Sequence, residues 1–304
     1  MRVLITGATG FLGRPLVHEL VARGHEVSVT VRPHTGTTRA AQAFPTDVAV
    51  HDVDLSAPFD GSGLPEVDAV VTLAQERDFR DFPASASKTL EVNVGSNVRI
   101  WEWASRTGVA KVVHASSGGI YGSGTGLAFT EDTLPPPHAQ NSFYLGTKLC
   151  AEIALRSFFP LFGSVVIVRP FFLYGPGQDS DKFVQRLINN IANGRPITLG
   201  GPDGIRTNPV FVDDAVRLFA DALDVGGSFT VNCAGAEIVN LRSLCDLIGL
   251  HLGTDPIYVD ATNAPDDCLG DTTLQFEVFG APRVSLDDGI ARAVGATPRG
   301  ATNA

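Results

Sequence analysis

A tyrosine and a lysine lie four residues apart in the segment SFYLGTKLCAE, which covers residues 142–152. Four residues is about one helical turn, so Tyr144 and Lys148 would share one face of a helix. Free tyrosine has a pKa of about 10, which is too high for a good base at neutral pH, and an ammonium group one turn away lowers that pKa by favouring the phenolate. The pair is therefore a candidate general acid/base. The alternative is two polar residues on a solvated helix face.

A glycine-rich loop near the start of the chain, TGATGFLG, follows the run RVLIT and precedes the helical pattern GRPLVHELVARG. A bound phosphate needs close backbone approach, free N–H groups and the positive end of a helix dipole. Glycine allows that approach because it has no Cβ. The position of the loop between a strand and a helix predicts a dinucleotide site rather than a plain tight turn. The residues that would contact the dinucleotide are Gly7, Thr9, Gly10, Phe11, Leu12 and Gly13.

The end of the second predicted strand distinguishes the two nicotinamide dinucleotides. An acidic residue there would hydrogen-bond the adenosine ribose of NAD, whereas an arginine would accept the 2′-phosphate of NADP. The sequence reads SVTVRPH, which places Val31 at the acidic position and Arg32 directly after it. This pattern favours NADP, and NAD is the alternative. Asp54 and Leu55, at the end of the third predicted strand, are candidates to hold the adenine edge.

Short apolar runs alternate with helical patterns over the first half of the chain, which predicts an α/β fold with a Rossmann-type doubly wound parallel sheet. Strands are expected at 2–6, 26–31, 48–55, 69–74, 111–117 and 164–170, and helices at 13–24, 88–107 and 142–159. After Pro170 the chain is richer in Gly, Pro and Asp, although 208–212 and 228–233 resemble further strands. We therefore expect a dinucleotide-binding domain over 1–170, to which 208–235 returns. A smaller, mostly C-terminal substrate-binding region would comprise 171–207 and 236–304.

The charge and the cysteines limit the partners and the compartment. The formal net charge is −10, so the chain has no basic footprint for nucleic acid. No apolar run reaches membrane-spanning length. Four scattered cysteines without metal-ligand spacing indicate reduced thiols in the cytoplasm, and the seven histidines show no ligand spacing either. We expect no membrane, no nucleic acid and no metal.

Eight segments together resemble the extended short-chain dehydrogenases/reductases, also called the NAD-dependent epimerase/dehydratase family, and they run through nearly the whole chain. Beyond the glycine loop and YLGTK, they include a fourth-strand segment, a serine segment and several late landmarks. The segments are TGATGFLG (6–13), VVTLAQ (70–75), NVGSNVRIWEWA (93–104), SSGGIYG (116–122), YLGTK (144–148), RPFFLYGPG (169–177), VFVDDAVR (210–217) and VSLDDGIARAV (284–294).

The resemblance implies roles for the residues of these segments. Tyr144 would be the acid/base, Lys148 would tune it and hydrogen-bond the nicotinamide ribose, and Ser117 would donate a hydrogen bond to the reacting oxygen. The fourth-strand segment would place Leu73 and Ala74 against the cofactor, with Gln75 next to the substrate.

The chain departs from the family pattern at two positions that commonly face a nucleotide diphosphate. Phe172 stands where the sugar-nucleotide enzymes have asparagine, and Thr207 stands where an arginine is frequent, with Arg206 beside it. Phe172 and Arg206 are therefore candidate contacts for a substrate that is either an unusual sugar nucleotide or not a sugar nucleotide at all. The segment SSGGIYG lacks the Thr-Asp-Glu of the family's 4,6-dehydratases, which argues against dehydration.

The resemblance also implies a homodimer in which the helix near 93–107 and the helix that starts near 142 form a four-helix bundle with their copies. Apolar residues at several angles of these helices are consistent with burial on more than one side. They are Ile100, Trp101, Leu145, Leu149, Ile153 and Phe158.

Three functions remain open at this point. The first is an NADP-dependent ketoreductase that transfers a hydride between nicotinamide and a keto or hydroxy carbon, with a sugar nucleotide as substrate. The second is an NAD-dependent sugar-nucleotide epimerase, and the third is a non-catalytic NADP-binding sensor or scaffold. Ser117, Tyr144 and Lys148 argue against the third, and Arg32 favours the first over the second.

Overall fold

The computed structural model describes residues 1–33, 44–122, 124, 126–135, 142–261 and 267–295. The chain divides into two compact units. The first unit comprises Met1–Ile120, Pro135–Arg169 and Val216–Val231, and the second comprises Tyr121–Leu134, Pro170–Ala215 and Asn232–Ala304.

Three segments that were expected in the dinucleotide-binding domain belong to the second unit, namely 121–134, 208–215 and 232–235. Backbone bridges explain the first of them, because Gly124 pairs with Asp267 and Phe129 pairs with Gly270. The roles of the two units as cofactor and substrate regions stay predictions.

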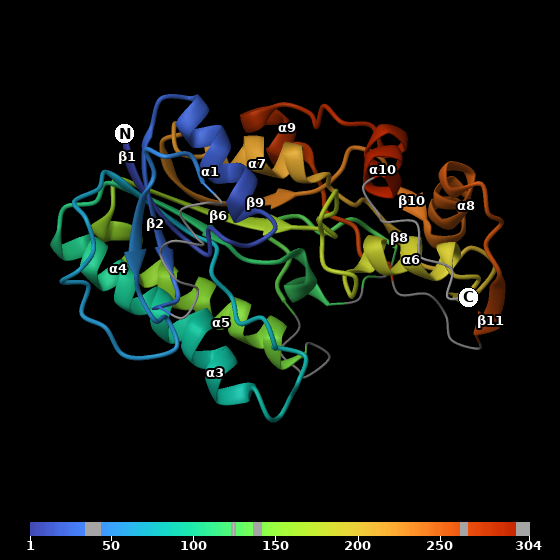
Figure 1. Ribbon diagram of the computed structural model, residues 1–304, viewed down its shortest axis with the longest axis horizontal. Helices are drawn as coiled ribbons and strands as arrows, with labels where there is room; N and C mark the ends of the chain where they lie inside the picture. Colours follow the sequence, from blue (N-terminus) through green and yellow to red (C-terminus); the bar gives the residue numbers. More distant parts are fainter. Residues whose placement is uncertain (34–43, 123, 125, 136–141, 262–266, 296–304) are drawn as a thin grey trace. The chain divides into compact units, whose positions relative to one another are not determined.

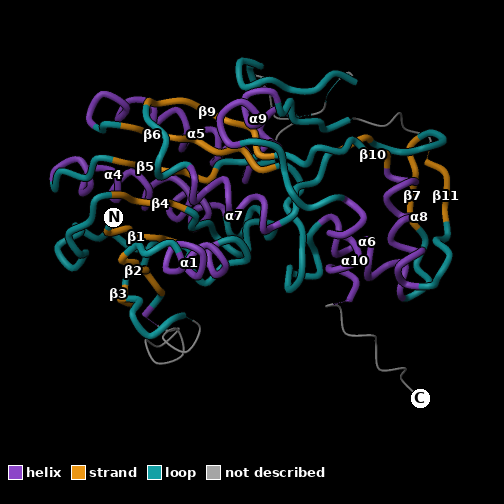
Figure 2. The backbone as a smooth tube through the Cα atoms, turned by 90° about the horizontal axis from the view of Figure 1, so that it is seen from above, coloured by secondary structure: helices purple, strands orange, loops and turns teal. Residues whose placement is uncertain are grey.

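A seven-stranded sheet forms the centre of the first unit, and its strands lie side by side in the order β3-β2-β1-β4-β5-β6-β9 (Figure 2). The five pairs from β3 to β6 are parallel. This sheet confirms the predicted Rossmann-type fold. The strands are β1 (Arg2–Thr6), β2 (Glu26–Val31), β3 (Ala49–Asp52), β4 (Ala69–Thr72), β5 (Lys111–Ala115), β6 (Ser164–Pro170) and β9 (Gly227–Cys233).

The strands follow from the apolar runs of the sequence. β1, β2, β4, β5 and β6 are almost fully buried along their length, as expected for parallel strands covered on both faces. β1, β2 and β6 have the predicted bounds. β3, β4 and β5 end two or three residues earlier than predicted, because the chain there leaves the sheet and forms the loops of the candidate site.

The strand order reverses at β1, which pairs with β2 on one side and with β4 on the other. In open parallel sheets, ligands bind outside the carboxyl ends of the strands at such a switch point. The loops that follow β1 and β4 meet at this place.

Helices cover both faces of the sheet, with α1 on one face and α3, α4 and α5 on the other (Figure 1). A single π-helical turn, η2, joins α3 to α4, so the predicted helix 88–107 is a helix with an irregular centre. Ile100 and Trp101 of α4 are fully buried in the core against the sheet. The bounds are α1 (Gly13–Ala22), α3 (Ala86–Leu90), η2 (Glu91–Gly95), α4 (Ser96–Arg106), α5 (Phe143–Phe158) and η4 (Phe159–Leu161).

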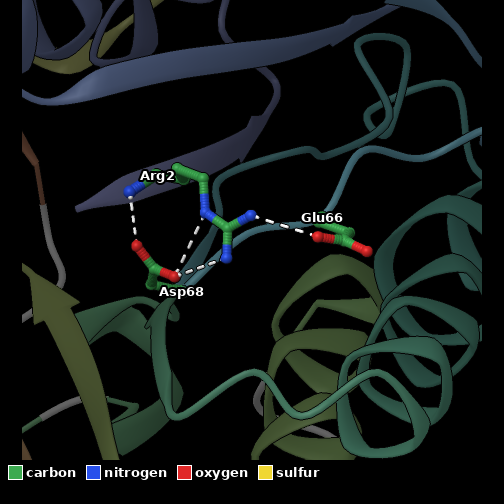
Figure 3. A network of polar contacts seen from close by, with 3 residues as sticks. All are labelled: Arg2, Glu66 and Asp68. Carbon is green, nitrogen blue, oxygen red and sulfur yellow. Dashed lines mark hydrogen bonds and ion pairs between the residues drawn. The ribbon is translucent and has the colours of Figure 1, made fainter.

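The amino ends of β1 and β4 are held by an exposed polar network (Figure 3). The backbone N–H of Arg2 donates to Asp68 at 2.7 Å, and its guanidinium donates to Asp68 at 2.9 Å and to Glu66 at 3.3 Å. These residues lie at the amino ends of the strands, whereas the glycine loop lies at the carboxyl ends. They therefore provide positions for control substitutions that leave the candidate site untouched.

The second unit consists of short helices and two-stranded sheets. The predicted strand at 208–212 is wrong: only Phe211 forms a bridge, with Tyr174. Pro209 lacks a backbone donor, and Val212 already begins α7 (Val212–Asp221), which continues into the first unit. The remaining elements are η3 (Gly118–Tyr121), α6 (Phe183–Ala192), β7 (Ile197–Gly200), β8 (Arg206–Thr207), β10 (Val239–Asn240), α8 (Leu241–Leu252), β11 (Tyr258–Ala261), α9 (Thr273–Phe279) and α10 (Leu286–Gly295).

Across the described part of the chain, no helix combines the length and the apolar character that crossing a membrane requires.

Candidate active site

Tyr144 and Lys148 lie on successive turns of α5, as the sequence predicted. The ammonium nitrogen of Lys148 donates a hydrogen bond of 2.9 Å to the backbone oxygen of Ala115, the last residue of β5. The same nitrogen lies 5.9 Å from the centre of the Tyr144 ring. The contact with Ala115 fixes the first turns of α5 against the carboxyl end of the sheet.

The expected fall in the pKa of Tyr144 is wrong. Burial raises the pKa of Tyr144 above its ordinary value, and the nearby charge of Arg80 offsets only part of this rise. Part of the residue is exposed to solvent, but the Phe79 ring is stacked on its ring, and desolvation outweighs the attraction of the Arg80 charge. Burial also lowers the pKa of Lys148 from 10.5 to about 8, while the charge of Glu152 acts in the opposite direction. Lys148 therefore loses its ammonium form as the pH rises past about 8.

Ser117 follows β5 by two residues and is half-buried. Its hydroxyl oxygen accepts a hydrogen bond from the backbone N–H of Gly119 at 3.2 Å. Gly119 faces α5, because a Cβ at this position would lie 2.9 Å from the Leu145 side chain. The serine segment is thus packed against the first turn of α5, next to Tyr144.

The segment after β4 covers the tyrosine. The hydroxyl of Tyr144 donates a hydrogen bond of 2.8 Å to Oε1 of Gln75. The ring of Phe79 is stacked on the tyrosine ring with centres 4.1 Å apart, and the guanidinium of Arg80 lies 5.2 Å from the centre of the Phe79 ring. The loop after β4 therefore contacts both the ring and the hydroxyl of the candidate acid/base.

The glycine loop forms a cradle of closely packed backbone, in which a Cβ on either of two glycines would collide with other backbone atoms. Gly7 has a φ of 73°, and a Cβ there would lie 2.6 Å from the backbone nitrogen of Ala74. A Cβ on Gly13, the first residue of α1, would lie 2.3 Å from the oxygen of Gly7. No side chain caps the start of α1, and its first turn carries no acidic residue. Exposed backbone beside the positive end of a helix fits the pyrophosphate of a dinucleotide.

We expect Gly7→Ala to disrupt this cradle. The substituted residue would need a left-handed conformation, which costs about 1–2 kcal/mol for an L-residue, and its methyl group would press on the Ala74 backbone. The free energy of unfolding should fall by more than this strain alone, and the Kd for dinucleotide should rise at least tenfold in a fluorescence titration. Gly24→Ala is the matched control, because Gly24 has a φ of 81° and open space around it. Equal effects of the two variants on dinucleotide binding would contradict the cradle.

The remaining predicted cofactor residues of the first unit also lie at carboxyl ends of strands. Arg32 is exposed directly after β2. Asp54 follows β3 by two residues, and its carboxylate accepts hydrogen bonds from the backbone and hydroxyl of Ser56 at 2.9 and 2.6 Å. Leu55 is half-buried beside it. The structure thus places the candidates predicted from the sequence at the carboxyl ends of the strands. Their contacts with a dinucleotide stay predictions.

A buried hydrogen-bond chain that the sequence did not predict holds the loop after β4 and the start of α5 together. The side-chain oxygen of Asn93, on η2, accepts from the backbone N–H of Glu76, and its amide nitrogen donates to the Thr147 hydroxyl, both at 2.9 Å. The Thr147 hydroxyl donates to the backbone oxygen of Tyr144 at 2.7 Å. Asn93 therefore connects the loop after β4 to the first turn of α5. An asparagine inside an apolar helix was the available signal, since buried amides need partners.

A fully buried ion pair lies one turn beyond Lys148. Glu152 of α5 accepts from Arg169 of β6 in a two-pronged arrangement, with Nε to Oε1 at 2.9 Å and Nη2 to Oε2 at 2.7 Å. The side chains are 1% and 3% exposed. The sequence signal was an arginine at the end of the otherwise apolar run SVVIVRP, because a buried arginine requires a partner. The pair ties α5 to the sheet next to the candidate site.

The two remaining candidates, Phe172 and Arg206, belong to the second unit. Phe172 has a φ of 40°, a left-handed conformation that strains a bulky residue, and its ring centre lies 4.7 Å from that of Phe183. Arg206 donates to Asp267 at 2.7 Å and to the backbone oxygen of Gly126 at 2.9 Å. Its charge is thus already paired within the unit.

Comparison with known proteins identifies the relatives of the chain. A model of the NAD dependent epimerase/dehydratase family matches residues 3–234. The chain is 30% identical to the UDP-glucose 4-epimerase of Mycolicibacterium smegmatis, with 97% of each chain covered. It is also 30% identical to a dTDP-4-dehydro-6-deoxy-D-allose reductase of Streptomyces, with 83% of this chain and 81% of the relative covered.

A solved structure with the same architecture is the UDP-glucose 4-epimerase of Thermus thermophilus in complex with NAD. The two chains superpose with a TM-score of 0.80 at 26% identity, and the match covers 97% of this chain and 98% of the other.

Proposed function

The chain belongs to the NAD dependent epimerase/dehydratase family, and from that membership we propose that it is an NADP-dependent ketoreductase of a sugar nucleotide. It is an enzyme of the extended short-chain dehydrogenase/reductase type. The observation that carries the proposal is the position of Tyr144 at the carboxyl ends of the strands, where its hydroxyl donates to Gln75 and the Lys148 nitrogen lies 5.9 Å from the centre of its ring. A protonated phenol is ready to deliver a proton to a carbonyl oxygen.

The proposed reaction divides between the cofactor and the side chains. A dinucleotide held by the glycine loop would supply the hydride that reduces the carbonyl carbon. Tyr144 gives its hydroxyl proton to the carbonyl oxygen, and the Ser117 hydroxyl donates a hydrogen bond to that oxygen as negative charge develops on it. Lys148, held by Ala115, then stabilises the phenolate left on Tyr144.

The direction of the reaction is supported by the acidity of the tyrosine. Oxidation of an alcohol, which is the first step of an epimerase, needs a base, whereas reduction of a ketone needs an acid. Burial raises the pKa of Tyr144 and so favours its protonated form, which is the form that the reduction of a ketone requires at its start.

Arg32 supports the choice of NADP, and we expect Arg32→Asp to reverse it. A charge-assisted contact with the 2′-phosphate contributes about 1.5–3 kcal/mol, so its loss should change the ratio of the NADPH and NADH dissociation constants at least tenfold. Paired Kd measurements by fluorescence titration test this. Arg106→Asp is the control, since Arg106 is an exposed arginine in the last turn of α4. An unchanged ratio in Arg32→Asp would refute the assignment.

An NAD-dependent sugar-nucleotide epimerase is the second candidate, because the UDP-glucose 4-epimerase relative matches 97% of the chain. An epimerase returns the hydride to its substrate and keeps its dinucleotide. The test is to purify the protein, denature it and quantify the nicotinamide released. The reductase proposal expects far less than one dinucleotide per chain and free exchange with added NADPH. Close to one NAD per chain would support the epimerase.

The substrate is proposed to be an unusual sugar nucleotide. Asparagine tolerates the left-handed conformation found at residue 172 better than most residues do, yet the chain has phenylalanine there. Strained residues are retained where the surrounding structure requires them. Phe172 next to Phe183 offers an apolar contact surface, whereas Arg206 is engaged by Asp267. Both residues are proposed to shape the choice of substrate rather than to perform the chemistry.

A homodimer formed through α4 and α5 is part of the proposal, with one correction to its basis. Ile100 and Trp101 are fully buried in the core and contribute nothing to such a surface. Ile153 of α5 and Leu90 of α3 are 60% and 47% exposed, and they carry the argument.

We expect light scattering at micromolar concentration to give about twice the 32.1 kDa of one chain. Ile153→Asp should shift the mass toward that of one chain, because it places a charge in the apolar surface. A wild-type mass near 32.1 kDa would rule out the dimer.

The cytoplasm is the proposed compartment. Cys150, Cys245 and Cys268 are free thiols, as is usual for proteins of reducing compartments.

A further inference from the structure

Gln75 contacts the reacting group of Tyr144 directly. It is exposed and follows β4 by three residues. Its Oε1 accepts the hydroxyl hydrogen of Tyr144 at 2.8 Å. Phe79, four residues later in the same loop, is stacked on the ring with centres 4.1 Å apart. One loop thus fixes both the plane of the ring and the direction of its O–H bond.

An acceptor at this position changes the acidity of the phenol. In the orientation found here, Oε1 of Gln75 faces the hydroxyl, so the bond is made only by the protonated form, because a phenolate could bond to Gln75 only after the amide turned its NH2 toward it. This bond therefore stabilises the protonated form and disfavours the phenolate. The cations around the tyrosine act in the opposite sense. These are Lys148 on α5, 5.9 Å from the ring centre, and Arg80 in the loop after β4. His114 of β5 lies close enough to Lys148 to respond to its charge, but burial lowers the pKa of His114 well below its usual range, so it is neutral.

We propose that Gln75 is a positioning residue that holds Tyr144 in its protonated, proton-donating form until the substrate oxygen replaces the amide as hydrogen-bond acceptor. When the substrate binds, the Tyr144 hydroxyl turns from Oε1 of Gln75 to the substrate carbonyl, to which its proton is transferred. The consequence for catalysis rests on the proposed reduction, whereas the hydrogen bond and its effect on Tyr144 do not. Gln75 acts in this account through Tyr144 and not by binding the substrate.

The acidity of Tyr144 can be measured without cofactor or substrate. The chain has four tyrosines, and replacing them biosynthetically with 3,5-difluorotyrosine makes every phenol more acidic and visible by fluorine NMR. Tyr144→Phe assigns the Tyr144 signal by its loss. A pH titration of the ligand-free protein then gives the apparent pKa of the fluorinated residue 144 in the wild type and in each variant.

Two substitutions at Gln75 should move this pKa in opposite directions. Gln75→Met keeps the size of the side chain and removes the acceptor, so the pKa should fall by about one unit, which is a tenfold change in the equilibrium. Gln75→Glu supplies a charged acceptor, so the pKa should rise by a similar amount. Glu66→Gln, at the opposite edge of the sheet, controls for a change of one unit of charge and should leave the signal unchanged.

An unchanged or higher pKa in Gln75→Met would overturn the proposal. Such a result would mean that the amide does not act as the acceptor for the hydroxyl of Tyr144 in solution. Because no hydride transfer is involved, this result would leave the proposed reductase activity standing. Conversely, the absence of reductase activity would leave the measured pKa shifts intact.

Discussion

Tyr144→Phe should reduce turnover by a factor of about 10²–10⁴, the range for a positioned acid/base. The substitution removes the hydroxyl that donates to Gln75 at 2.8 Å and leaves the ring that is stacked on Phe79. The Kd for NADPH and the free energy of unfolding should change little, because Lys148 keeps its contact with Ala115. Steady-state kinetics, with dinucleotide binding measured in parallel, separate the loss of chemistry from a loss of binding.

Tyr258→Phe is the control for this prediction. Its hydroxyl contacts Arg242 and Asp246 in the second unit and takes no part in the proposed chemistry. It should retain turnover close to that of the wild type. Near wild-type turnover in Tyr144→Phe would remove this residue from the acid/base role.

Glu152→Gln should lower the free energy of unfolding by about 3–5 kcal/mol, because it leaves the charge of Arg169 buried without its partner. Both side chains are almost completely buried and joined by two hydrogen bonds. Urea denaturation followed by tryptophan fluorescence measures the effect, since both tryptophans belong to the same unit as the pair. The double variant Glu152→Leu/Arg169→Met should recover most of the loss, because it removes both charges.

An exposed ion pair with the same separation provides the comparison. Arg292 and Asp213 are also 2.7 Å apart, but their side chains are 48% and 51% exposed. Asp213→Asn should lower the free energy of unfolding by less than about 1 kcal/mol, the usual contribution of a surface ion pair. A cost of the same size in Glu152→Gln would show that burial does not make the Glu152–Arg169 pair important for stability.

The sequence predicted the sheet well because the pattern that indicates each strand lies within a few consecutive residues. The bounds of β1, β2 and β6 follow from short runs rich in β-branched residues, with glycine or proline at or just after their ends. The strand expected at 208–212 was wrong, because Pro209 and the early start of α7 leave one bridge at Phe211. The first unit also lacks residues 121–134, whose pairing with 267–270 joins segments far apart in the chain. Such long-range pairing leaves no periodic pattern to read.

The candidate site was predictable in its residues but not in its electrostatics. The spacing of Tyr144 and Lys148 placed both on α5, where the structure has them. The expected fall in the pKa of Tyr144 did not follow, because the sequence does not reveal that the phenol is desolvated by burial, with the Phe79 ring stacked on its own ring. The hydrogen bonds of Asn93 were likewise not predictable, since its partners Glu76 and Thr147 come from two other segments.

The most direct test of the proposed reaction uses NADPH deuterated at the transferable position of the nicotinamide ring. The protein is incubated with this cofactor and a panel of UDP-, dTDP- and GDP-linked keto sugars, and the products are analysed by mass spectrometry. We expect one deuterium on one sugar carbon for each NADPH oxidised, with no transfer in Tyr144→Phe beyond its residual rate. Interconversion of two sugar nucleotides without net oxidation of NADPH and without deuterium in the product would contradict the reductase.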